Sequence, residues 1–184
     1  MKLFHQQHFD RSSILQKGEY EACIFNNCDF SDQSLKEISF ISCEFTDCNL
    51  SNAQIHNTSF QDILFTRCKL MGLRFDLCNP FSLELHFKDC TLDFSSFTKC
   101  NLKNTKFVKT SLVGIDFTES NLTGIYFDEC NLLNTIFYQT LLDRSDFTSA
   151  VNFNINPEQN KLKKTKFSTN GLKGLLTGYD IIIK

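Results

Sequence analysis

Nine cysteines and four histidines are the residues of this chain with the most obvious chemistry. Regularly spaced thiols can form disulfides or bind soft metal ions. Every cysteine lies two residues before a position that recurs every five residues, and the full set is Cys23, Cys28, Cys43, Cys48, Cys68, Cys78, Cys90, Cys100 and Cys130. Stacked chain segments would project these thiols in parallel, which does not converge on a tetrahedral zinc ion. We therefore interpret the cysteines as small buried residues and expect them to stay reduced.

The other chemically active residues argue against catalysis. His5 and His8 are three residues apart, but no acid or cysteine is placed to complete a metal site with them. The chain has no G-x-x-x-x-G-K-S/T, G-x-G-x-x-G, HExxH or CxxC motif. Buried thiols are also poor nucleophiles. We expect no catalytic, cofactor-binding or metal-binding residues, and hence no enzyme.

The recurring position, which we call the central position, is nearly always Phe or Leu. A period of five residues fits neither a helix nor a strand, so it indicates a short unit stacked many times. The pattern shifts once by two residues. It comprises Phe25, Phe30, Leu35, Phe40, Phe45, Leu50, Ile55, Phe60, Phe65, Leu70 and Phe75, and then Phe87, Leu92, Phe97, Leu102, Phe107, Leu112, Phe117, Leu122, Phe127, Leu132, Phe137, Leu142 and Phe147.

Small or β-branched residues occupy the position two before each central position, and polar residues occupy the other three. The central side chain and its small companion therefore point inward. Four five-residue sides would close a coil of 20 residues, and successive coils would lie ~4.8 Å apart as in any β-ladder. Residues 20 apart would then stack, with Phe columns opposite each other and Leu columns between them. We expect about seven coils on this spacing.

Several segments match a known motif closely. They are "CDFSD" (28–32), "CNLSN" (48–52), "CNLKN" (100–104), "SNLTG" (120–124) and "CNLLN" (130–134). The pattern resembles the pentapeptide-repeat family, written A(N/D)LXX. That resemblance implies an all-β fold, a right-handed quadrilateral β-helix. It specifies the fold but says little about function, because one scaffold carries many activities.

Breaks in the pattern predict three parts. Residues 1–19 are off-register and are expected to cap the first coil, residues 20–167 form the β-helix, and residues 168–184 form a short helix and an apolar tail. The register shift falls within residues 76–86 and predicts a small loop. The helix and tail resemble the end of the quinolone-resistance (Qnr) branch of the family. That resemblance implies dimerisation at this end, and the apolar residues there predict a homodimer through Leu172, Leu175, Leu176, Tyr179, Ile181 and Ile183. A tail that only caps its own end is the alternative.

Charge is banded along the chain. Residues 19–66 carry eight acids and one base, and residues 111–160 carry seven acids and one base, whereas residues 67–110 and 161–184 are basic. In a stacked coil these become bands along a rod. One interpretation is an ordinary mixed surface; the other is two acidic girdles that dock onto basic partners. The second interpretation singles out Asp116, Glu119, Asp128 and Glu129.

A second candidate contact surface is apolar. The residue after the central position forms a column that ends in Val113, Leu133 and Phe153, an exposed stripe beside polar residues. A terminal tail folded over the stripe is the alternative explanation.

Two functions remain open. The first is a non-catalytic protein-binding module that, by resemblance to Qnr proteins, modulates a type II topoisomerase such as DNA gyrase. The second is a structural or self-assembling repeat protein. A DNA mimic should be continuously acidic, and this chain is not. The sequence lacks a signal peptide and a bilayer-spanning apolar run, so we expect a cytoplasmic protein without membrane contact and without direct nucleic-acid binding.

Overall fold

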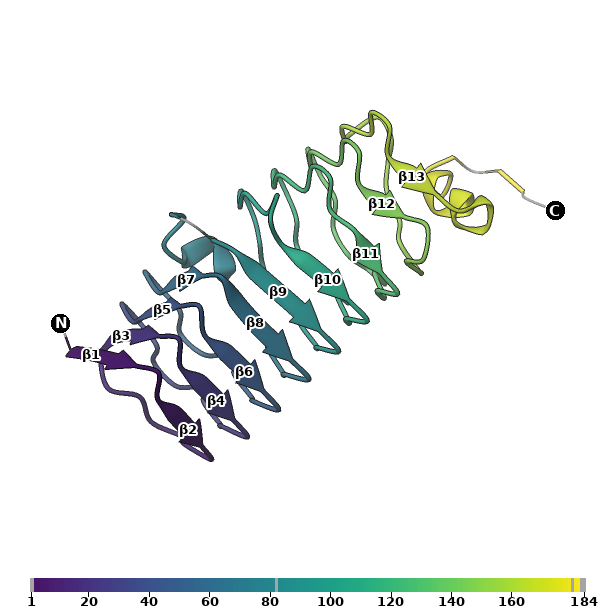
Figure 1. Ribbon diagram of the computed structural model, residues 1–184. Helices are drawn as coiled ribbons and strands as arrows, with labels where there is room; N and C mark the ends of the chain where they lie inside the picture. Colours follow the sequence, from purple (N-terminus) through teal and green to yellow (C-terminus); the bar gives the residue numbers. More distant parts are fainter. Residues whose placement is uncertain (1, 82, 180, 183–184) are drawn as a thin grey trace.

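The computed structural model describes residues 2–81, 83–179 and 181–182. The chain winds into a β-solenoid of about eight turns that stack along one axis, with the two termini at opposite ends (Figure 1). The quadrilateral β-helix predicted from the five-residue period, right-handed as the pentapeptide-repeat resemblance implied and with a short helix near its C-terminal end, is confirmed.

All strand pairing in the described chain is parallel and joins one coil to the next. The largest sheet runs along one side of the rod, and Phe25, Phe45, Phe65 and Phe87 pair in register within it. It consists of β2 (His8–Asp10), β4 (Ile24–Asn26), β6 (Glu44–Thr46), β8 (Ile63–Thr66), β9 (Leu85–Lys88), β10 (Lys106–Val108) and β11 (Phe127–Asp128). A second sheet holds β1 (Lys2–His5), β3 (Gly18–Glu21), β5 (Ser39–Ile41) and β7 (Ser59–Gln61), and the third pairs β12 (Asp146–Phe147) with β13 (Lys166–Phe167). Isolated parallel bridges connect the coils elsewhere.

The N-terminal residues join the solenoid. The expectation of a separate cap over residues 1–19 needs correction, because β1 pairs with β3 and β2 pairs with β4 in continuous register. The Phe4 ring stacks on Tyr20 at 4.5 Å, and Phe9 stacks on Phe25 at 4.9 Å. Phe4 and Phe9 are five residues apart, but both are offset by one residue from the central positions of the main run. They therefore form a terminal coil, which the expected number of about seven coils left out.

Each corner of a coil uses a left-handed backbone conformation. The residue two after the central position has positive φ in most coils, as at Asn27 (53°), Asp47 (55°) and Arg67 (52°). Asn, Asp and Gly tolerate this region best, which explains their frequency at this position. The amide of most corner residues donates to the next coil, for example from Asn27 to the Thr46 carbonyl at 3.0 Å. The inter-coil hydrogen bond offsets the strain of the corner.

Columns of stacked rings fill the core. The longest column contains nine phenylalanines whose neighbouring centroids are 4.5–5.6 Å apart, from Phe9 through Phe25, Phe45, Phe65, Phe87, Phe107, Phe127 and Phe147 to Phe167. Rings of the opposite column meet it edge-on, as where Phe117 approaches Phe107 at 6.2 Å and 73°. Each such pair contributes ~0.5–1.5 kcal/mol beyond burial. The core is thus an aromatic ladder that runs nearly the whole length of the rod.

The small side chains two residues before the central positions donate hydrogen bonds to buried backbone carbonyls. The Thr58 hydroxyl donates to the Leu35 carbonyl at 2.8 Å, and the Ser145 hydroxyl donates to the Leu122 carbonyl at 2.6 Å. The Cys43 thiol makes the same contact with the Tyr20 carbonyl at 3.2 Å. A small side chain with one polar hydrogen suits this position, so Cys, Thr and Ser alternate there. All nine cysteines are free, and only Cys100 is not fully buried.

The register shift and the C-terminal end interrupt the ladder. A 3-10 turn, η1 (Phe75–Leu77), is followed by an exposed Phe81 before Leu85 rejoins the sheet opposite Ile63. The predicted C-terminal helix is the 3-10 helix η2 (Thr169–Leu175), capped where the Gly171 amide donates to the Ser168 hydroxyl at 3.2 Å. Nowhere in the described chain is there a helix with the length and apolarity to cross a bilayer.

Replacing Phe117 with Asp should prevent folding. Its side chain is buried between Phe97 and Phe137, and an aspartate there has no partner for its charge. The loss should exceed the ~3–5 kcal/mol typical of truncating a buried Phe. Phe117→Leu is the matched control, because Leu35 already occupies this column, and it should cost under ~1.5 kcal/mol. Circular dichroism melts measure both; a cooperatively melting Phe117→Asp protein would contradict the fold assignment.

The thiols should make the protein less stable at alkaline pH. Burial raises the pKa of Cys43, Cys100 and Cys130 to about 12, whereas unfolded thiols ionise near ~8.5. Unfolding therefore releases protons above that pH, so the free energy of unfolding is constant below ~8.5 and falls between ~8.5 and 12.

Thiol titration at pH 8 should label Cys100 first and all nine cysteines only after denaturation. Rapid native labelling of most thiols would contradict this.

Candidate protein-binding surface

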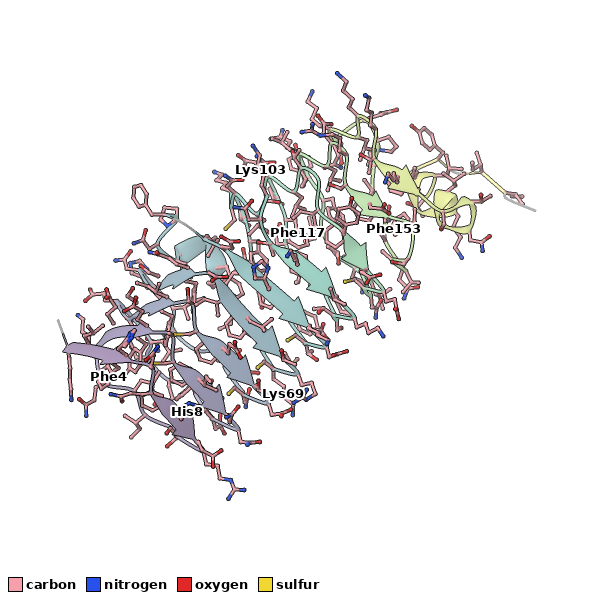
Figure 2. All side chains as sticks on the ribbon, in the orientation of Figure 1. Phe4, His8, Lys69, Lys103, Phe117 and Phe153 are labelled. Carbon is pink, nitrogen blue, oxygen red and sulfur yellow. The ribbon has the colours of Figure 1, made fainter. Side chains whose placement is uncertain are left out.

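An open groove of about 950 Å³ lies at the C-terminal end of the rod. One wall is the last regular coil, which contributes Leu133 and Ile136. The other wall is the C-terminal segment, which contributes Leu176, Tyr179 and Ile181. Figure 2 labels Phe153 beneath this end of the rod, where η2 and the tail meet the coils. The groove joins residues from the predicted partner surface with residues from the predicted dimer contact.

Apolar side chains surround this groove at positions that elsewhere are polar. Leu133 is 45% exposed and Ile136 is 49% exposed, and Tyr138 and Leu141 continue the patch around the same coil. Exposed large apolar side chains that cluster on a rigid scaffold are typical of contact sites. Leu133 is one of the predicted contact residues, whereas Ile136, Tyr138 and Leu141 were not included among them. Their positions just before or just after a central position were the available signal.

Phe153 lies inside the solenoid, not on its surface. The expectation that it is an exposed contact residue is wrong, because its side chain is 6% exposed and its ring packs against Phe147 at 5.4 Å and Phe167 at 5.5 Å. The regular pattern ends at this coil, and Phe153 turns inward to fill the space beneath η2. Gly171 and Gly174 let the helix approach the ring, since an added Cβ would lie 2.8 Å from it at either position.

The remaining residues of the predicted dimer contact divide into two groups. Leu172, Tyr179 and Ile181 are exposed, and Leu176 is half-buried. Leu175 packs on the core, while Ile183 lies outside the described residues. The Tyr179 hydroxyl donates to Glu158 at 3.0 Å, and this carboxylate raises the pKa of Tyr179. Tyr179 thus fixes the tail against the last coil and leaves its ring at the groove.

The predicted acidic residues do not form one surface. Asp128 and Glu129 lie at the end of the large sheet, at and beside β11. Asp116 bridges to Ser96 and Ile136 in a separate ladder, and Glu119 follows it there. Val113 is half-buried on a third side. Any single partner on a flat surface would therefore meet only one of the two acidic pairs.

Basic residues of a neighbouring coil pair with two of these acids and with acids elsewhere on the rod. Lys99 lies 3.7 Å from Glu119, and Lys109 lies 3.7 Å from Glu129. The guanidinium of Arg67 binds both oxygens of Asp47 at 2.7–2.8 Å and lowers the pKa of that carboxyl. Each of these pairs joins residues 20 apart. The acidic and basic bands of the sequence therefore neutralise each other where they meet.

Two exposed aromatic residues were not identified from the sequence as surface features. Phe94 lies over Gly114, where an added Cβ would approach its ring to 2.8 Å, and Tyr126 is exposed on the large sheet. A glycine 20 residues after an aromatic residue was the available signal for Phe94. Neither residue lines the C-terminal groove.

The sequence matches the model of the pentapeptide repeat region over residues 19–85 and 64–137, which is more than half of the chain. Together with the five-residue repeat and the four-sided coil, this match shows that the chain belongs to the pentapeptide-repeat family. Among curated proteins, none matches the sequence.

The solved structures of QnrB1 share this fold. One trypsin-treated form, described as a plasmid-mediated fluoroquinolone resistance protein, has 16% sequence identity and a TM-score of 0.65 over 100% of each chain. A second trypsin-treated form has 18% identity and a TM-score of 0.64 over 99% of this chain and 98% of that one. At this level of identity the likeness concerns the fold alone.

Proposed function

We propose that this protein is a non-catalytic, cytoplasmic protein-binding module whose main contact surface is the C-terminal groove. The observation that carries the proposal is the cluster of exposed apolar side chains that line this groove from both walls. A rigid groove with apolar walls and a polar rim suits a protein partner. The nine free thiols are consistent with a reducing compartment.

The first partner proposed is a second copy of the chain. The exposed edge at the end of a solenoid must be covered, and a symmetric contact can cover the C-terminal ends of both copies at once. Leu172, Tyr179 and Ile181 are exposed beside the groove and would enter such a contact. We propose that the same contact extends to Ile183.

The second partner proposed is a type II topoisomerase such as DNA gyrase. The proposal rests on the shared fold with QnrB1, whose description is that of a fluoroquinolone resistance protein, and on the acidic residues that could face a basic DNA-binding surface. The two acidic pairs occupy different sides, so we propose that one side makes the contact. We propose no direct binding of nucleic acid.

One observation favours the alternative of a structural or self-assembling protein. Glu119 and Glu129 already pair with lysines of the preceding coil, so less negative charge is free for a partner than the sequence suggests. Exposed pairs of this kind contribute only ~0–1 kcal/mol each and exchange readily. They weaken the electrostatic argument for a topoisomerase without affecting the apolar groove.

Introducing charge at the C-terminal contact should dissociate the dimer. Light scattering should give the intact chain twice its 21.3 kDa mass, and Leu172→Asp combined with Ile181→Asp should give a monomer because both side chains are exposed and would place charge in the contact. Ile14→Asp is the matched control, since Ile14 is exposed at the other end of the rod. A monomeric intact chain would refute the dimer and leave the tail as a simple cap.

Reversing one acidic pair should remove an effect on gyrase. In a supercoiling assay with and without a quinolone, Asp116→Lys with Glu119→Lys is compared with Asp128→Lys with Glu129→Lys. None of the four side chains belongs to the buried core, so the fold should survive. One double variant should lose the effect while the other keeps it. The effect should weaken with salt, because exposed charges are screened beyond ~8 Å at physiological ionic strength. Unchanged gyrase activity and quinolone sensitivity with excess protein at low salt would rule out this partner.

A further inference from the structure

Three potential metal ligands converge beside the register shift. Asp62, Glu84 and His86 each offer one ligand atom, and the three atoms lie within 4.8 Å of one another. We propose that these residues bind a divalent transition-metal ion such as Zn²⁺. The site is independent of the C-terminal groove.

The backbone places the three residues firmly. Asp62 forms a corner with φ of 53°. The Glu84 amide donates to the Phe60 carbonyl at 3.3 Å, and the Ile63 amide donates to the Glu84 carbonyl at 3.0 Å, so Glu84 is attached to the preceding coil next to Asp62. His86 follows on β9, in register with Leu64. The two extra residues of the insertion bring Glu84 to this place.

The distances suit a shared ion better than direct hydrogen bonds. Nε2 of His86 lies 3.6 Å from a Glu84 oxygen and 3.8 Å from an Asp62 oxygen. Hydrogen bonds between such atoms are ~2.7–3.2 Å long. Two ligands each about 2.1 Å from zinc at the tetrahedral angle lie roughly 3.4 Å apart. A single ion between the three side chains would need only small side-chain movements.

His86 is unsatisfied by the residues around it. Its side chain is 19% exposed, and its Nδ1 is buried without a hydrogen-bond partner among the described residues. With Nε2 also beyond hydrogen-bond distance of both carboxylates, neither nitrogen gains a strong protein contact. A half-buried imidazole with no partner is costly, and a bound ion at Nε2 would supply one.

The local charge also favours a cation. Asp62 and Glu84 lie close together, and within the described chain neither makes an ion pair with a lysine or arginine. Acids at other corners do pair with such a base one coil away, as Asp47 does with Arg67. The cavity beside His86, about 430 Å³ and lined also by Ser42 and Lys88, leaves room for water in the remaining coordination positions.

The ligand set indicates the class of metal. One imidazole nitrogen and two carboxylate oxygens suit first-row transition ions, whereas Mg²⁺ and Ca²⁺ favour oxygen alone. The cysteines point into the core and are not part of the site.

Binding of Co²⁺, with Zn²⁺ as competitor, tests the proposal on the full-length chain. The intact protein should bind one equivalent with visible absorption that lacks thiolate-to-cobalt charge transfer. Asp62→Asn and His86→Ala should each weaken binding at least ~10-fold, the lower limit for losing even an outer-shell partner. Asn tolerates the positive φ of position 62, so that variant keeps the corner.

His56→Ala is the control, because His56 is an exposed histidine away from the cavity. This variant should bind Co²⁺ with the affinity of the intact protein. Melting curves establish that each variant is folded. Failure of the intact protein to bind, equal binding by the folded Asp62→Asn variant, or a thiolate charge-transfer band would each overturn the proposal.

Discussion

The structure depends on the parallel hydrogen bonding of each coil to the next. Most amides in the coils donate to a carbonyl of the neighbouring coil, as between Leu35 and the Gln54 carbonyl at 2.9 Å. Over most of the rod the coils therefore keep a length of 20 residues, and the two extra residues before β9 leave the ladder. The same constraint stacks identical core positions and produces the nine-membered phenylalanine column. It also places charges 20 residues apart beside each other, so that Lys109 meets Glu129.

Both the C-terminal groove and the proposed metal site lie where this constraint is relaxed. The C-terminal groove exists because the pattern fails after Phe147, where Phe153 turns inward and η2 closes the end. The cluster around His86 exists because two extra residues at the register shift carry Glu84 next to Asp62. The regular coils between them present mostly polar side chains. In this molecule the repeat provides the scaffold, and its irregularities provide the candidate sites.

Sequence reasoning predicted the regular part of the fold well, because a single period determined which side chains point inward. It predicted Phe153 incorrectly, because the period was extended past the coil where it ends. It assigned residues 1–19 to a cap because a one-residue offset concealed the spacing of Phe4 and Phe9. The cluster proposed here as a metal site could not be found from local spacing, because Asp62 and Glu84 are distant in sequence and meet only through the conformation of the insertion. Convergence of Leu133 with Tyr179 and Ile181 likewise depends on the path of the tail, which has no periodic signal.

The central proposal is that a rigid ladder carries its apolar self-association surface at its C-terminal end. Hydrogen–deuterium exchange measured over a range of protein concentrations tests it most directly. The account predicts slow exchange throughout the coils at every concentration, with added protection on association confined to residues 131–142 and 172–181. Rapid exchange within the phenylalanine column, or protection that develops along β4, β6 and β8 instead, would contradict it.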